Sequence, residues 1–190
     1  MGVFNVEKVN NSDSVKSFER EELINFLAEE LFYSYESKKI IKNEFLRTCQ
    51  LRSKAIGEEL FFLTVDFYRQ KGLSRWKHNM SDFITQAAKE QIESGSKNLS
   101  GLIFEHIVPK NIYIKKLSEA AANGQLSIAL ISDTLHKYYY TCTVTVAEDK
   151  LLGRTQMPAG WDLEDPFYRY KNAGIEYTEN PHNFRVKDKK

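Results

Sequence analysis

A carboxylate and an imidazole stand side by side in a short apolar stretch, at Glu105 and His106. Gly101 and Pro109 bracket this stretch. Its β-branched and aromatic residues favour a strand, which ends where proline has no amide hydrogen to donate. Neighbouring side chains of a strand point to opposite faces, so the two groups do not naturally pair with each other. They can serve one site only if the strand ends or twists here. The alternative role for His106 is that of a core histidine held by a backbone carbonyl.

The segment 105–109, Glu-His-Ile-Val-Pro, resembles the first motif of the HNH nuclease superfamily. The core of those nucleases is a β-hairpin followed by a helix, which together hold one metal ion (the ββα-metal fold). Their acidic residue is a metal ligand and their histidine is the general base. The resemblance therefore implies that Glu105 binds a metal ion and that His106 deprotonates the attacking water.

A second segment extends the resemblance. Thr145 is followed three residues later by Glu148, which is the spacing of a capping box, so a helix is predicted to begin near Val146. In several HNH-like families the second strand runs into Thr-x-Glu-Glu-His-x-x-Leu, and the segment 145–152, Thr-Val-Ala-Glu-Asp-Lys-Leu-Leu, is similar. Asp149 falls where those families have a metal-binding histidine. An oxygen ligand favours Mg²⁺ or Mn²⁺ over zinc. Glu148 is expected to close the capping box, which leaves Asp149 to face the motif strand.

The segment 157–175 also resembles the tail of such nuclease-like families. Within it, Arg169 is the cation that we assign to the scissile phosphate, because its fork of donors suits phosphate oxygens. A structural salt bridge is the alternative role for Arg169. His182 is a second candidate base, and a solvated histidine in a turn is the alternative there.

These assignments describe a metal-dependent endonuclease with DNA as its substrate. A divalent ion held by Glu105 and Asp149 would polarise the phosphate and the leaving oxygen. His106 would take the proton of the water, because the ordinary pKa of histidine lies near neutral pH. The usual signatures of nucleotide binding, serine hydrolysis and zincin chemistry do not occur in the sequence. The rival interpretation is a non-catalytic helical module that binds a protein or a nucleic acid, in which the Glu-His pair is incidental.

The composition is ordinary for a globular protein, with 42% hydrophobic and 28% charged residues in a chain of 190. A net charge of +1 gives no global indication of nucleic-acid binding, so any basic surface must be local. Cys49 and Cys142 have the spacing of neither a disulfide framework nor a zinc ribbon. The sequence shows neither an apolar signal-peptide stretch nor a membrane span, so we expect a cytoplasmic protein without a membrane partner. The oligomeric state stays open, a homodimer included.

Hydrophobic periodicity predicts an α+β fold, with a helical N-terminal half followed by a ββα-metal unit. The expected divisions are a flexible arm over 1–16, a helical region over 17–97 and the nuclease-like region over 98–190. The two strands of the unit are expected near 103–108 and 139–145. Two helices are predicted between these strands, one ending near Asn123-Gly124 and one running through Ile128, Leu135 and Tyr138.

Three helices are predicted in the N-terminal half. Ser17 is the expected cap of the first, which buries one face from Leu23 to Tyr35. An apolar stripe predicts one long second helix, from Ile41 to about Arg69. Ser81 is expected to cap a third helix, with Phe83, Ile84, Ala87, Ala88 and Ile92 on its apolar face and its end at Ser94-Gly95-Ser96. Four cations of the second helix lie mostly off its stripe, as a phosphate-binding face or simply as solvated charges: Lys42, Arg47, Arg52 and Lys54.

Overall fold

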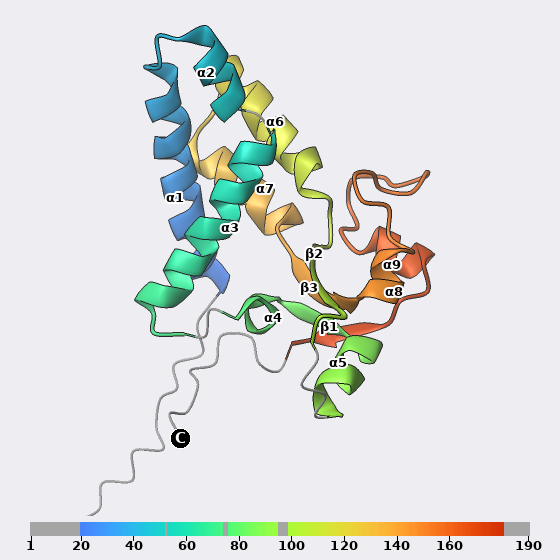
Figure 1. Cartoon of the computed structure of the whole chain (residues 1–190). Coiled ribbons are helices and arrows are strands. Elements are labelled where there is room, and N and C mark those ends of the chain that lie inside the picture. Colours follow the sequence, from blue (N-terminus) through green and yellow to red (C-terminus); the bar gives the residue numbers. More distant parts are fainter. Residues whose placement is uncertain (1–19, 52, 74–75, 95–98, 181–190) are drawn as a thin grey trace, which may run out of the picture.

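The computed structural model describes residues 20–51, 53–73, 76–94 and 99–180, and it is an α+β protein (Figure 1). The arm predicted over 1–16, the cap at Ser17 and the candidate base His182 lie outside the described residues. Within the described ranges, no helix is both long enough and apolar enough to cross a membrane.

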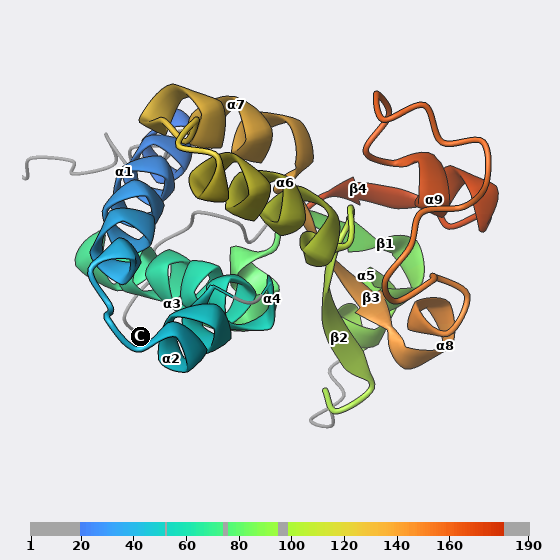
Figure 2. The ribbon, with the colours of Figure 1, turned by 90° about the horizontal axis from the view of Figure 1, so that it is seen from above.

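Five helices pack into one body: α1 (Arg20–Lys39), α2 (Glu44–Gln50), α3 (Ser53–Gln70), α6 (Lys110–Ala122) and α7 (Ile128–Tyr138). α1 packs on α7 and α3 packs on α6 (Figures 1 and 2). The buried face of α1 is the predicted one, and α6 and α7 occupy the two stretches predicted between the strands. Apolar side chains at helical spacing fill the space between these helices, among them Leu27, Leu31, Ile56, Leu60, Tyr113, Leu117, Ile131 and Leu135.

The prediction of one long helix from Ile41 to Arg69 is wrong, because two helices cover this stretch. Asn43 caps α2, with its side-chain oxygen accepting a hydrogen bond from the Leu46 amide (3.0 Å). α2 ends at Leu51, and α3 begins at residue 53. After the break, Ile56, Leu60 and Phe67 are buried in the body, whereas Phe45 before it is 71% exposed, so only the α3 part of the apolar stripe faces the core.

A four-stranded sheet lies beside this body, in the order β2-β3-β1-β4. Its strands are β1 (Phe83–Thr85), β2 (Leu102–His106), β3 (Thr141–Thr145) and β4 (Tyr177–Glu179). β2 pairs with β3 and β1 with β4 in antiparallel fashion, whereas β1 and β3 are parallel. The two strands predicted for the motif therefore exist and pair, with slightly different bounds.

The helix predicted from Ser81 is wrong in its first turn. Phe83, Ile84 and Thr85 form the strand β1, and the helix α5 (Gln86–Glu93) begins only after Thr85. The Thr85 hydroxyl caps α5 by accepting from the Ala88 amide (3.2 Å). Strand pairing on both edges of β1 outweighs the helical periodicity of this stretch.

Among the described residues there are also three short helices: α4 (Lys77–Met80), α8 (Val146–Asp149) and α9 (Tyr168–Asn172). α8 and α9 lie on the side of the sheet away from the helical body (Figure 2). A second apolar cluster forms between them and the sheet, around Ile107, Cys142, Val144, Leu152, Tyr170 and Ile175. The sheet is thus a middle layer, and each strand can present side chains to two environments.

The order of β2, β3 and α8 is the one expected from the resemblance, although α6 and α7 join the two strands in place of a tight turn. The boundary expected at residues 97–98 falls between α5 and β2. Elements from both sides of it share the helical body and the sheet, because α3 packs on α6 and β1 pairs with β3. The helical region and the nuclease-like region therefore form one packed structure.

Candidate functional site

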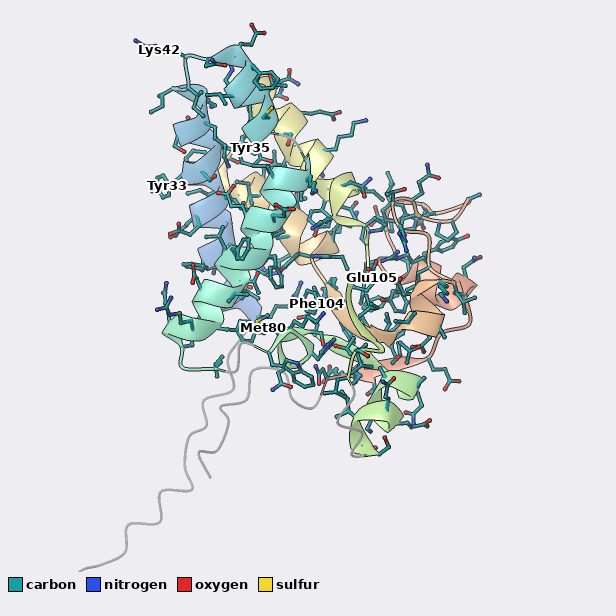
Figure 3. All side chains as sticks on the ribbon, viewed as in Figure 1. Tyr33, Tyr35, Lys42, Met80, Phe104 and Glu105 are labelled. Atoms are coloured by element: carbon teal, nitrogen blue, oxygen red, sulfur yellow. The ribbon has the colours of Figure 1, made fainter. Side chains whose placement is uncertain are left out.

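Glu105 and His106 close the strand β2 and point to opposite faces, as predicted from strand geometry. Glu105, which Figure 3 shows between the helical body and α9, reaches Arg169 on α9. The His106 ring instead contacts Tyr113 on α6. The strand ends at His106, and both side chains line one pocket at this end. The strand end therefore brings the two groups into one site.

His106 is held by aromatic side chains of α6, of β2 and of the residue that follows α7. Its Nδ1 shares a hydrogen bond with the Tyr113 hydroxyl (3.2 Å), and its ring lies 6.0 Å from that of Phe104 and 5.8 Å from that of Tyr139. Its Nε2 makes no hydrogen bond to any residue that the structure describes. Burial, together with the positive charges of Lys110 and Arg169, lowers the pKa of His106 to about 3. The ring is therefore neutral at physiological pH.

Arg169 is 1% exposed and ties the end of β2 to the chain after α8. Its Nε donates to the Ile107 carbonyl (2.7 Å) and its Nη1 to the Gly153 carbonyl (2.6 Å). Its Nη2 donates to Glu105 Oε1 and to the His106 carbonyl. A guanidinium engaged on every nitrogen and covered from solvent cannot contact a phosphate in this conformation. The geometry is that of a structural salt bridge, the alternative role for this residue.

The side chain of Glu105 is 20% exposed, and its carboxyl group has a raised pKa. Burial is the largest cause, and the attraction of Arg169 opposes it only in part. The negative charge of Asp149 raises the pKa of Glu105 further, which places the two carboxylates within electrostatic reach of each other. A bound cation would relieve both effects, because it favours the ionised carboxylates.

The capping box predicted at the start of α8 is confirmed. The Glu148 amide donates to the Thr145 hydroxyl (3.2 Å), and Glu148 Oε2 accepts from the Thr145 amide (2.8 Å). The same oxygen also accepts from the hydroxyls of Thr145 (2.9 Å) and Thr85 (2.7 Å). Glu148 therefore joins α8 to the sheet. Asp149, the last residue of α8, is half-buried.

The carboxylates fit only an ion that takes few protein ligands. Within the described ranges, no three His, Cys, Asp or Glu side chains are placed to hold a metal ion together. Asp149 is not among the residues that line the pocket, and its link to Glu105 is the electrostatic effect on the pKa of Glu105. Two carboxylates would suit Mg²⁺, which is commonly held by one or two carboxylates with water and substrate phosphate as the other ligands. Zinc, which prefers nitrogen and sulfur in a closed set of four, fits this pair poorly.

The pocket itself is basic. Its volume is about 270 Å³, and it is lined by Lys54, Glu105, His106, Pro109, Lys110, Asn111, Arg154 and Thr155. Three of these side chains are cations, and they come from α3, from the start of α6 and from the chain after α8. Of the predicted phosphate-binding face, Lys54 lines this pocket, and Arg52 lies outside the described residues. Lys42 lies at the far end of the helical body (Figure 3), and Arg47 lines a different cavity, beside Lys39.

Sequence patterns missed Lys110 and Arg154. Lys110 follows directly after Glu-His-Ile-Val-Pro, so its closeness to the motif was the signal that could have found it. Arg154 has no such signal, because it lies 48 residues after His106 in an irregular stretch. No protein-family model, no curated protein and no solved structure matches the chain.

Proposed function

We propose that the protein is a metal-dependent endonuclease that hydrolyses phosphodiester bonds in DNA at the pocket beside the end of β2. One observation carries the proposal. The neutral imidazole of His106 lines a pocket, and its Nε2 forms no hydrogen bond with the described residues. The other side chains of the pocket that can carry a charge are three cations and Glu105. A proton acceptor next to convergent positive charge suits a reaction in which water attacks a phosphate. The resemblance to the HNH motif gives the same role to the same histidine.

The base role fixes the tautomer of His106. Its Nδ1 donates to the Tyr113 hydroxyl, so that the lone pair of Nε2 faces the pocket. The water oxygen forms the new bond to phosphorus and one water proton passes to Nε2. The bond from phosphorus to the 3′ oxygen breaks, and the 3′ oxygen takes a proton from solvent water to leave as a hydroxyl. The developing negative charge on the phosphate oxygens meets the cations of the pocket.

Glu105 and Asp149 would hold the divalent ion, Mg²⁺ or Mn²⁺. When bound, such an ion supplies charge neutralisation at the phosphate and at the leaving oxygen. Arg169 acts as a positioning residue, because its hydrogen bonds fix Glu105 and the backbone on both sides of the strand end.

Cleavage of supercoiled plasmid tests the proposal. The wild-type protein should nick or cut the plasmid with Mg²⁺ or Mn²⁺ and not with EDTA. His106→Ala should lose about 100- to 10,000-fold in rate, the range for a general base. The matched control is His136→Ala on α7, because His136 pairs with Glu21 away from the pocket. The proposal fails if the wild type cleaves neither DNA nor RNA with any divalent ion, or if His106→Ala cleaves like the control.

A non-catalytic interaction module is the second candidate. Apolar side chains are exposed where α1 turns into α2: Ile40 is 79% exposed, Phe45 71% and Leu46 50%. Apolar residues gathered on a surface are typical of a protein-binding site. Replacing Phe45 and Leu46 with serine should abolish partner binding under this candidate and leave plasmid cleavage unchanged under the first.

A further inference from the structure

Lys54, Lys110 and Arg154 line the same pocket, and the positive charge of Lys110 acts on Glu105 there. None of the three forms an ion pair with another residue in the part of the chain that the structure describes. Glu105, the carboxylate of the pocket, is already bonded to Arg169. Like charges brought together repel, and an anion would turn this repulsion into attraction.

Several cations elsewhere in the described residues are neutralised by a carboxylate. Lys38, Lys71, Lys137 and Lys171 each contact a carboxylate, at 2.5 to 2.8 Å. The N-terminus of α6 adds partial positive charge at the pocket, since Lys110 and Asn111 are its first residues and no side chain caps it.

Gly57 on α3 makes room for one of these cations. A Cβ at residue 57 would lie 2.9 Å from Lys110 Cδ, 3.0 Å from Lys110 Cε and 3.2 Å from Ile114 Cδ1. The aliphatic stem of Lys110 therefore lies directly on the backbone of α3. The glycine is not needed for the backbone of α3, because its φ is an ordinary one. What it permits is the close approach of Lys110.

We propose that Lys54, Lys110 and Arg154 bind a phosphate of a nucleic acid backbone beside His106. The sequence-based prediction assigns this phosphate to Arg169. This inference rests on the proposed function for the identity of the ligand. The guanidinium of Arg154 supplies a planar fork for two phosphate oxygens, and the two lysines supply point charges. Binding itself needs neither the divalent ion nor the base.

Fluorescence anisotropy with a short labelled single-stranded DNA in EDTA measures this binding without cleavage. Lys54→Gln, Lys110→Gln and Arg154→Gln should each weaken binding about tenfold, as expected for a lost charge-assisted hydrogen bond. Each should also reduce the slope of log affinity against log salt by about 0.7. The matched control is Lys116→Gln, an exposed lysine of α6 that does not line the pocket. Equal losses in all four variants, or none in the three pocket variants, would overturn the proposal.

Gly57→Ala tests the geometry with every charge retained. The new methyl group should displace Lys110 and weaken DNA binding, whereas the melting temperature should stay level or rise, because alanine favours a helix. Unchanged affinity in this variant would contradict the placement of Lys110.

Competition identifies the ligand. Unlabelled single-stranded DNA should displace the probe at far lower concentration than inorganic phosphate, because a chain contacts the basic surface at more than one phosphate. Displacement by inorganic phosphate at an equal concentration would overturn the nucleic-acid assignment. If the pocket variants lose binding although the wild type never cleaves, the phosphate site stands and the endonuclease proposal fails. If the wild type cleaves DNA and each of the three pocket variants cleaves it equally well, the endonuclease proposal stands and the phosphate site fails.

Discussion

Replacing Arg169 by methionine should destabilise the protein strongly, because the guanidinium serves the fold. Methionine has a similar length but no donors. The change would leave the carbonyls of His106, Ile107 and Gly153 without their hydrogen bonds and Glu105 without its counter-ion. Removing one partner of a buried ion pair costs about 3–5 kcal/mol. We therefore expect the free energy of unfolding to fall by about that amount.

Urea denaturation followed by tryptophan fluorescence measures this loss. Arg154→Met is the matched control, because the same change at an exposed arginine should alter stability by about 0.5 kcal/mol or less. The double variant Arg169→Met with Glu105→Gln should recover part of the loss, since an amide is less costly than an unpaired carboxylate in a buried position. The structural role would be refuted if Arg169→Met lowered the free energy of unfolding by less than about 1 kcal/mol and the double variant recovered nothing. Arg169 would then be assigned to the scissile phosphate again.

Two further predictions concern the metal ligands and the pH dependence of stability. Asp149→Asn should weaken the binding of Mg²⁺ or Mn²⁺ in calorimetric titration. Glu148→Gln should keep the affinity for the ion and cost about 1 kcal/mol or less of stability, because glutamine still closes the capping box. The opposite pattern of affinities would make Glu148 the metal ligand. Burial lowers the pKa of His106 to about 3 and that of His78 to about 4, so the unfolded chain binds more protons below about pH 6.5. The free energy of unfolding should therefore fall as the pH drops from about 6.5 toward 4, by at most about 1.4 kcal/mol per pH unit for each histidine. His106→Gln should show a shallower fall in urea titrations at several pH values, and an unchanged slope would contradict the buried, neutral ring.

Local sequence determined the features that depend on neighbouring residues. The alternation of a strand put Glu105 and His106 on opposite faces, and Pro109 marked the point just beyond which the helix α6 begins. The spacing of Thr145 and Glu148 gave the capping box. Each of these depends on a few consecutive residues, whose backbone geometry limits the possible outcomes.

Tertiary structure decided what requires partners distant in the chain. The stretch 83–85 has helical periodicity but pairs as a strand, since β3 and β4 flank it. Thr85, at its end, also donates to Glu148, a contact that no local pattern contains. The role of Arg169 likewise depends on carbonyls more than 60 residues earlier in the chain, at His106 and Ile107.

The basic pocket shows the same division. Lys54, Lys110 and Arg154 are unremarkable in sequence, and a net charge of +1 gave no sign of a positive site. They become one site only because α3 packs on α6 and because Arg169 fixes the chain beside Arg154 through the Gly153 carbonyl. Electrostatic interaction depends on distance in space, so the folded arrangement, and not the order of residues, concentrates the charge.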